Sequence, residues 1–334
     1  MVKKKIMKKV GLLSIGLGMF LGTMTSGASL VANAAANPNP TWYVGARCFF
    51  NGPTGAWDDI SVKDPSIVYA NGKYHLFYTG YAQSGTFQMG YASAPTISGL
   101  STAQHKKLDL NGSWGRNGSY GAPQVFYMES KHMWYLIYQG SLGACYATTT
   151  NIDDPNSWSG PKSMGASGNM GWDYWVICDD QNAYMFNTPS DGSHNIYCRK
   201  TSLANFPNGW GPATVAVRDT FEGACVYKSK ADNKYYLIVE DMKDNRYYEL
   251  HQANSLNGPW TKVSEKWASS HNLSYTADKW TNRVSHGEIL RSGINQKLEI
   301  NDINRADFLI QGSMDGNVAY EKIKWDLGII KNYK

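Results

Sequence analysis

VKDPSIVYANGKYHLFYTG, residues 62–80, contains two strand-like runs joined by a two-residue turn. Residues 67–69 are β-branched or aromatic, Asn71 and Gly72 form a dipeptide preferred in tight hairpin turns, and residues 74–78 return along the first run. The stretch therefore predicts a β-hairpin. A single carboxylate, Asp64, stands before a proline at the open end of this hairpin. Such an aspartate usually serves as a turn or cap residue, so its meaning depends on the rest of the chain.

The hairpin pattern recurs four more times along the chain. A strand, a polar turn and a strand follow one another in 122–139, 173–186, 222–240 and 286–300. The five units start 49 to 64 residues apart, and repeats of about 50 residues are typical of β-propeller blades. The 44 aromatic residues, the 33 glycines and the lack of long helical periodicity favour the same all-β class. The sequence predicts a five-bladed β-propeller in a single domain.

Each unit opens on a small or polar residue, and these residues are Asp64, Ala122, Asp173, Glu222 and His286. If the first strand of every blade is innermost, they converge on the propeller axis at one face. Buried carboxylates without partners are costly, so three of them from three blades indicate a functional site rather than a structural core. A carboxyl pair suits glycoside hydrolysis, in which one protonates the leaving group and the other activates water.

The first 34 residues have the pattern of a secretory signal peptide. Five lysines precede residue 10, an apolar run covers residues 10–21, and Ala-Asn-Ala ends at residue 34. The apolar run is short and rich in glycine, which argues against a membrane-spanning helix, although an uncleaved anchor is the alternative. We expect a secreted protein, free of the membrane after cleavage, with residues 35–334 as its catalytic domain.

The charge pattern argues against nucleic acid as a partner. The whole chain carries +5, and the five N-terminal lysines account for all of this excess. The predicted mature chain is therefore neutral and has no cluster of lysine or arginine. The aromatic surplus of a neutral, exported protein suits either stacking on sugar rings or the packing of hairpins, and composition does not decide between the two.

The cysteines show neither a CxxC motif nor metal-ligand spacing. They are Cys48, Cys145, Cys178, Cys198 and Cys225. Most lie among strand-like residues, which favours buried thiols. One disulfide is an open alternative, and its pairing cannot be read from the sequence.

Six blocks of the sequence resemble glycoside hydrolase family 62 and follow the order of that family. They are VKDPSIVYANGKYHLF (62–77), APQVFY (122–127), WDYWVICDD (172–180), FEGACVYK (221–228), WTNRVSHGEILR (280–291) and FLIQG (308–312). The resemblance extends from about residue 42 to the C-terminus. It implies a five-bladed propeller and an inverting α-L-arabinofuranosidase that removes arabinose side chains from arabinoxylan or arabinan. No seam for assembly is evident, so we expect a monomer.

The resemblance also implies roles for individual residues. Asp64 would be the general base, Glu222 the general acid, and Asp173 would orient the acid and favour its protonated form. The carboxyls of an inverting pair lie roughly 6.5–9.5 Å apart, which leaves room for a water. If Glu222 were not the acid, Glu240 and Glu288 would be the next candidates.

Four further residues are expected to surround the substrate. Lys63, Gln139 and Tyr320 would bind sugar, although Lys63 could instead only pair with a neighbouring carboxylate. His286 matches the axial histidine of the family, beside which a calcium ion is often bound. Calcium prefers oxygen ligands, so waters and carbonyls would supply most of its coordination shell.

Two departures from the family pattern concern the polymer rather than the reaction. Residues 138–141 read Tyr-Gln-Gly-Ser where the family commonly has YQWG, and Glu321 replaces an asparagine. The preference between arabinoxylan and arabinan, and between O2 and O3 linkages, therefore stays open. Two alternative interpretations remain, a family 43 β-xylosidase or arabinanase and a non-catalytic sugar-binding propeller.

Overall fold

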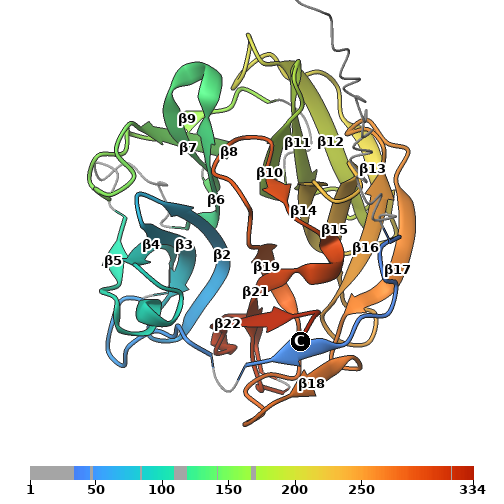
Figure 1. The fold of residues 1–334 in the computed structure, drawn as a ribbon. Helices are drawn as coiled ribbons and strands as arrows, with labels where there is room; N and C mark the ends of the chain where they lie inside the picture. Colours follow the sequence, from blue (N-terminus) through green and yellow to red (C-terminus); the bar gives the residue numbers. More distant parts are fainter. Residues whose placement is uncertain are drawn as a thin grey trace, which may run out of the picture. The chain divides into compact units, whose positions relative to one another are not determined.

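Five β-sheets stand around a common axis in the part of the chain that the structure describes (Figure 1). The computed structural model describes residues 34–45, 48–82, 85–108, 119–140, 142–166, 171–316 and 318–334. These residues belong to one unit, Ala34–Lys334, and the predicted signal peptide lies outside them except for its last residue. The arrangement is the five-bladed β-propeller that the sequence predicts, and we number its sheets as blades I to V.

The blades follow one another along the chain. Blade I contains β2 (Ser61–Ala70), β3 (Lys73–Tyr81), β4 (Phe87–Ala94) and β5 (Lys106–Lys107). Blade II contains β6 (Gly121–Met128), β7 (Met133–Gly140), β8 (Gly143–Thr149) and β9 (Lys162–Ser163). Blade III contains β10 (Trp172–Cys178), β11 (Asn182–Thr188), β12 (Asn195–Ser202) and β13 (Thr214–Arg218). Blade IV contains β14 (Glu222–Ser229), β15 (Tyr235–Asp241), β16 (Tyr247–Ala253), β17 (Thr261–Ala268) and β20 (Glu299–Ile300).

Blade V joins the two ends of the described chain. It contains β19 (Ser285–Ile289), β21 (Asp307–Gly312), β22 (Asp326–Lys331), β1 (Trp42–Val44) and β18 (Leu273–Tyr275). The N-terminal strand β1 pairs antiparallel with the C-terminal strand β22 and parallel with β18. The ring of blades is thus closed by main-chain hydrogen bonds between residues far apart in the sequence.

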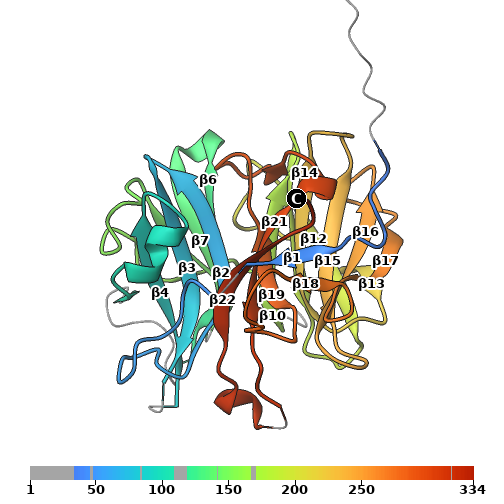
Figure 2. The same cartoon turned by 60° about the horizontal axis from the view of Figure 1, so that its bottom comes forward.

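The first strand of each blade lies innermost, as the sequence analysis assumed. The strands β2, β6, β10, β14 and β19 each contact the first strand of the next blade, and β19 contacts β2 (Figures 1 and 2). The remaining regular elements are short 3₁₀ helices, η1 (Ser98–Thr102), η2 (Glu129–Lys131), η3 (Ile303–Arg305) and η4 (Tyr320–Lys322). Among the described residues, no helix is long and apolar enough to cross a membrane.

Four of the five predicted hairpins are confirmed, and the fifth is wrong. Each of the first four units folds its first strand onto the next along the chain. In the predicted unit 286–300, however, β19 pairs with β21, and β20 joins blade IV parallel to β14. The physical reason is burial, because residues 308–310 are apolar and fully buried beside β19, whereas β20 contributes only two residues to a sheet edge.

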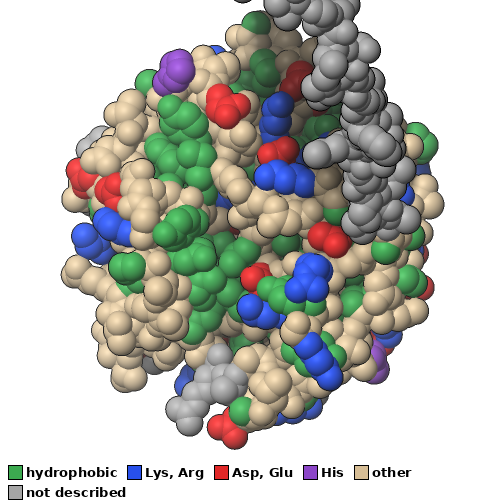
Figure 3. All heavy atoms as spheres, viewed as in Figure 1, with side chains coloured by type: hydrophobic (Ala, Val, Ile, Leu, Met, Phe, Trp, Pro, Cys, Tyr) green, Lys and Arg blue, Asp and Glu red, His purple; other side chains and the backbone are tan. Residues whose placement is uncertain are grey.

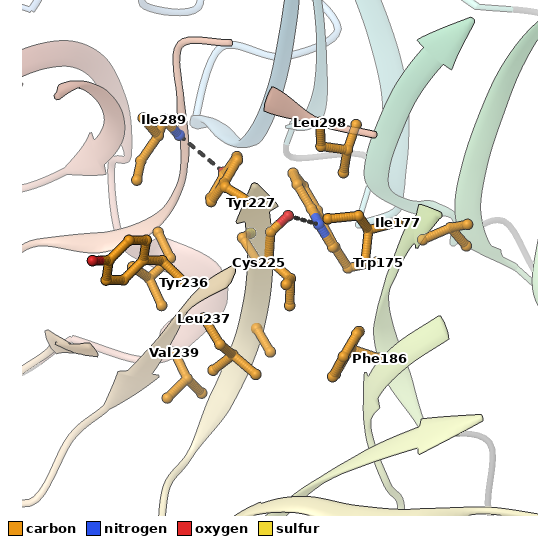
Figure 4. Packing of buried hydrophobic residues seen from close by; sticks show 14 of the residues in the cluster. Trp175, Ile177, Phe186, Cys225, Tyr227, Tyr236, Leu237, Val239, Ile289 and Leu298 are labelled. Atoms are coloured by element: carbon orange, nitrogen blue, oxygen red, sulfur yellow. Dashed lines mark hydrogen bonds between the residues drawn. The ribbon is translucent and has the colours of Figure 1, made fainter. Parts of the chain in front are cut away.

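The core between blades III, IV and V combines aromatic rings with aliphatic side chains (Figure 4). Trp175 on β10 donates its Nε1–H to the carbonyl of Val226 on β14 at 3.0 Å. The backbone N–H of Ile289 on β19 donates to the hydroxyl of Tyr227 at 3.0 Å. The largest fully buried side chains are all tryptophan, tyrosine or phenylalanine. Packing of the blades therefore accounts for much of the aromatic surplus.

All five cysteines lie in the described part of the chain, and none forms a disulfide. Four are buried, as expected, and Cys48 is half-buried. Burial raises the pKa of Cys198 to about 12, with only partial relief from Lys200 and Arg199. Such a thiol stays protonated at neutral pH, which fits a packing role.

Candidate active site

The same bulge occurs near the start of the first strand in every blade. The register shifts lie between Lys63 and Ser66, Gly121 and Gln124, Trp172 and Trp175, Glu222 and Cys225, and Ser285 and Gly287. In four blades one bulge residue has φ in the left-handed region, at 48° for Asp64, 49° for Ala122, 55° for Asp173 and 69° for Gly223. The counterpart of Asp64 in blade IV is therefore Gly223, and Glu222, the residue on which that unit opens, lies one residue earlier.

A hydrogen bond from the preceding blade holds most of these bulges. A side chain on the second strand of one blade accepts the bulge N–H of the next, in the pairs Thr79 with Ala122, Gln139 with Asp173, Glu240 with His286, and Gln311 with Asp64, at 2.7–2.9 Å. In blade III the equivalent residue on the second strand is Thr188, and its buried hydroxyl has no hydrogen-bond partner in the described residues. The repeat thus fixes the backbone from which the candidate side chains project.

A cavity of about 360 Å³ opens at this end of the inner strands. It is lined by Lys63, Asp64, Thr79, Phe87, Ser119, Tyr120, Gly121, Gln139, Gly140, Gly171, Trp172, Asp173, Glu222, His286, Gln311 and Tyr320. All seven residues that the sequence analysis selected for catalysis, substrate or metal belong to this lining. The convergence of the blade starts on one site is therefore observed.

Asp64 and Asp173 face the same imidazole. Nδ1 of His286 lies 3.5 Å from Oδ1 of Asp64 and 3.9 Å from Oδ2 of Asp173. Burial lowers the pKa of His286, but the carboxylates around it outweigh burial and raise it overall. The histidine is thus favoured in its charged form, between two carboxyl groups.

The two aspartates differ in their electrostatic surroundings. Burial alone would raise the pKa of Asp64, but Lys63 and His286 oppose it and hold the pKa below its usual range. Burial raises the pKa of Asp173 to about 7, since Glu222 and Asp64 add to it and His286 only partly opposes it. Asp64 is therefore favoured in its ionised form, whereas Asp173 keeps its proton to a higher pH than an ordinary aspartate.

Both carboxyl oxygens of Glu222 accept hydrogen bonds. Nε1 of Trp172 donates to Oε2 at 3.0 Å, and Nη1 of Arg246 donates to Oε1 at 3.0 Å. The Glu222 side chain keeps 17% of its surface exposed, against 7% for Asp64. Glu222 therefore stands nearer the mouth of the cavity, in a different set of contacts from the two aspartates.

Lys63 pairs within the site. Its Nζ lies 3.4 Å from Oδ2 of Asp64 and donates to the hydroxyl of Tyr320 at 2.6 Å. Burial lowers the pKa of Lys63, but Asp64 and Tyr320 outweigh this and raise it. Lys63 thus does pair with a neighbouring carboxylate, and its contact with a sugar stays a prediction. Tyr320 is 41% exposed on the cavity rim.

A second cavity lies at the other end of the inner strands, on the face seen in Figure 3. It measures about 490 Å³ and is lined in part by Tyr69, Asp307 and Tyr333. Two carboxylates line it. Asp307 is engaged by the hydroxyl of Tyr333 at 2.8 Å and by Lys331 at 3.2 Å, and Asp302 accepts the backbone N–H of Asn304 at 2.8 Å. The converging carboxylates are therefore a property of the smaller cavity, which is the candidate active site.

Known proteins resemble this chain over most of its described length. The family model described as glycosyl hydrolase family 62 matches residues 46–331. Alpha-L-arabinofuranosidase C of Cellvibrio japonicus (strain Ueda107) is 36% identical over 285 residues, which cover 81% of this chain and 44% of that protein. The chain thus spans less than half the length of this relative.

The chain belongs to glycosyl hydrolase family 62. Among solved structures, the catalytic domain of a Coprinopsis cinerea GH62 α-L-arabinofuranosidase matches with a TM-score of 0.80 at 30% identity, over 88% of this chain and 97% of that one. A GH62 hydrolase in complex with xylotriose matches with a TM-score of 0.78 at 28% identity, over 87% and 97% of the two chains. The match decides between the two enzyme families considered above.

The fallback candidates for the acid of this family 62 chain are occupied elsewhere. Glu240 and Glu288 are fully buried, and each is paired with an arginine, Arg246 and Arg291 respectively. Oε1 of Glu288 lies 2.6 Å from Nε of Arg291. Buried, paired carboxylates are poorly placed to reach a sugar, which leaves Glu222 as the candidate acid.

The residues around His286 do not form a calcium site on their own. Calcium takes six to eight oxygen ligands, and the nitrogen of His286 that faces the aspartates lies at ion-pair distance from both. The described residues contain no group of three His, Cys, Asp or Glu side chains suited to a metal. Any calcium here would depend mainly on water ligands.

Sequence reasoning missed three residues of the site. Trp172 directly precedes Asp173, and Gln311 lies in the FLIQG block, so both stood inside segments already singled out. Arg246 lies in a polar turn before β16, and nothing in its sequence context marks it. Gln139 was expected to bind sugar, and its Oε1 accepts the N–H of Asp173 at 2.9 Å.

Proposed function

We propose that this chain is a secreted, inverting α-L-arabinofuranosidase that removes arabinofuranosyl side chains from arabinoxylan. The observation that carries the proposal is the cavity in which three carboxyl groups from three blades meet in unlike surroundings. An ionised carboxylate beside two cations suits a base. A carboxyl that lines the same cavity and keeps 17% of its side chain exposed can reach a leaving group, as an acid must. Inverting glycosidases need these two roles on separate residues.

Asp64 is the proposed base. Its carboxylate takes a proton from a water molecule, whose oxygen attacks the anomeric carbon of the arabinofuranosyl group. Lys63 and His286 stabilise the ionised form of Asp64 and so keep it ready to accept the proton. The bulge N–H of Asp64 is held by Gln311 at 2.8 Å, which limits the positions open to the carboxylate.

Glu222 is the proposed acid. It gives its proton to the glycosidic oxygen as the bond to the anomeric carbon breaks, so the xylose hydroxyl leaves neutral. The freed arabinose carries the hydroxyl from water with inverted configuration. Asp173 lines the same cavity, and burial together with Glu222 and Asp64 raises its pKa to about 7; it is the proposed residue that orients the acid.

The polymer is proposed from the relatives and from the rim of the cavity. A family 62 hydrolase has been crystallised with xylotriose, a fragment of a xylan backbone. Trp172 and Tyr320 offer partly exposed rings at the cavity, and such rings stack on sugar faces. Arabinan remains the second polymer to test, and Lys63, Gln139 and Tyr320 are the proposed sugar contacts. Secretion, a monomeric state and a water-ligated calcium beside His286 complete the proposal.

The deciding experiment is a product assay on purified protein. We expect release of free arabinose from wheat arabinoxylan, with the β-anomer as the first product by NMR. Release of xylose or of oligoarabinosides in its place would favour the chemistry of the family 43 alternative. Binding to xylo-oligosaccharides with no released sugar would favour the non-catalytic alternative.

A further inference from the structure

We propose that Arg246 and Glu240 are positioning residues that hold the acid Glu222 at a fixed distance from the base Asp64. The proposal rests on the function proposed above, because it assigns a role within that reaction. Its basis is an unbroken series of hydrogen bonds that runs from the carboxyl of Glu222 to the backbone of Asp64. The series passes through blades IV, V and I.

Arg246 forms the acid end of the series. Its Nη1 donates to Oε1 of Glu222 at 3.0 Å and also to Oε1 of Glu240. Only 11% of the Arg246 side chain is exposed. The guanidinium lies 5.2–5.8 Å from the ring centres of Phe221, Tyr320 and Trp325. Rings on several sides leave the guanidinium few other positions, so the carboxyl it holds is held firmly.

Glu240 carries the series into blade V. Its Oε2 accepts from Oγ of Ser285 at 2.8 Å and from the N–H of His286 at 2.7 Å. Glu240 is fully buried, and a buried carboxylate without its cation is strongly destabilising. Arg246 therefore cannot turn away from Glu240 without leaving this charge unpaired, which anchors the acid end of the series.

Gln311 completes the connection to blade I. Its Nε2 donates to Oγ of Ser285 at 3.0 Å, and its Oε1 accepts the N–H of Asp64 at 2.8 Å. Asp64 sits in the left-handed region at the bulge, where the backbone sets the direction of the side chain. One end of the series thus holds the acid by its side chain, and the other holds the base by its backbone.

This series restrains a distance that the sheets leave open. The inner strands of blades IV, V and I belong to three different sheets, so no main-chain ladder fixes the spacing between Glu222 and Asp64. An inverting reaction needs a spacing that admits one water. A displacement of about 1 Å can cost on the order of 10²-fold in rate.

The test measures two substrates that differ in their need for the acid. The conservative variant Arg246→Lys keeps the positive charge but loses the planar guanidinium. We expect kcat on arabinoxylan to fall by about 10²-fold with little change in KM. We expect kcat on 4-nitrophenyl arabinofuranoside to fall far less, because the phenolate leaves without a proton. The ratio of the two kcat values is the readout, since a general loss of folded protein leaves it unchanged.

Ser285→Ala interrupts the series by removing one small hydroxyl and is the variant least prone to unfold. We expect it to move the ratio in the same direction by about tenfold. Lys262→Gln is the matched control, because Lys262 pairs with the fully buried Glu249 at 2.7 Å in the same blade, outside the series. We expect this control to leave the ratio unchanged. Thermal melts accompany all three variants.

The outcomes separate the two proposals. If Arg246→Lys and Ser285→Ala fold and lower both kcat values by the same factor, or leave both unchanged, the positioning role is overturned and the proposed function stands. If the wild-type chain releases no arabinose from either substrate, the proposed function is overturned and this inference falls with it.

Discussion

Blades I and IV use the same bulge to present a carboxylate, yet they place it on different residues. In blade I the carboxylate belongs to the left-handed residue, Asp64, which faces His286. In blade IV the left-handed residue is Gly223, and the carboxylate belongs to the residue before it, Glu222. The bulge interrupts the regular alternation of the strand, so that adjacent residues such as Lys63 and Asp64 both line the cavity. Glu222, one residue before the left-handed position, contacts Trp172 and Arg246, and one repeated scaffold places two carboxylates in different surroundings.

The largest effect is expected where the comparison predicts a base. Asn at position 64 tolerates the left-handed backbone and keeps the size of the side chain, but cannot accept the proton from water. We expect Asp64→Asn to lower kcat roughly 10²–10⁴-fold on arabinoxylan and on the aryl substrate alike. Initial rates and melting curves on one preparation provide the check. Turnover close to wild type would remove Asp64 from the mechanism.

The next largest loss of activity should fall mainly on arabinoxylan. Glu222→Gln keeps an acceptor for Arg246 but has no proton to donate. We expect a loss of roughly 10²–10⁴-fold on arabinoxylan, whose leaving group is a sugar hydroxyl, and a much smaller loss on 4-nitrophenyl arabinofuranoside. Equal losses on both substrates, with the melting temperature kept, would mean that blade IV does not carry the acid.

Gly223 offers a direct test of the shared bulge. Alanine there must adopt a φ of 69°, and its Cβ would lie 3.4 Å from Nδ1 of His286. We expect Gly223→Ala to lower the free energy of unfolding by about 1–2 kcal/mol and also to lower kcat. Gly72→Ala is the control, since Gly72 has a φ of 76° in the β2–β3 turn with no atom within 4 Å of the added Cβ. The control should lose stability but keep kcat, and a matching loss of kcat in both would contradict the ring contact.

The pH dependence of stability tests the aspartate of blade III. Burial raises the pKa of Asp173 to about 7, so the native state binds this proton more tightly than the unfolded chain does. The cost of ionising Asp173 is absent near pH 4 and grows as the pH rises through about 7. Asp173→Asn removes that cost, so its melting temperature should rise relative to wild type between pH 4 and pH 8. A difference that shrinks over this range would contradict the raised pKa.

The smallest effect is expected at His286, whose imidazole faces Asp64 of blade I and Asp173 of blade III. If calcium binds beside His286, excess calcium should raise the melting temperature relative to EDTA in the wild-type protein, and His286→Ala should remove the difference. Differential scanning fluorimetry in both buffers measures this. Superimposable wild-type curves would count against a bound ion.

The repeat pattern predicted the fold well because hairpins are local. Asn71-Gly72 and the alternation around it specify β2 and β3 without help from distant residues, and the same holds for three further blades. Blade V could not be predicted from local sequence. Its strand β19 pairs with β21, and the strand between them in the chain, β20, pairs with β14 of blade IV. Nothing local to residues 286–300 separates that arrangement from a hairpin.

The site was predicted as a set of residues but not as a geometry. The seven selected side chains do line one cavity, since the blade starts meet at the axis. The carboxylate belongs to the left-handed residue in blade I (Asp64) but to the residue before it in blade IV (Glu222). This offset depends on backbone φ angles, which cannot be read from the sequence. Arg246 was missed because its importance comes from two carboxylates that only the folded blades bring together.

The pairing of β1 with β22 has a consequence for how the chain folds. Tyr43 meets Lys331 in this ladder, so the ring cannot close until the chain has been synthesised through Lys331. Contacts between such distant segments carry a high loop-closure entropy and form slowly. The blades can assemble one after another as local hairpins, but the final seam waits for both termini. Ring closure is therefore the natural slow step, and loss of either terminal strand should leave an open arc of blades with an exposed edge.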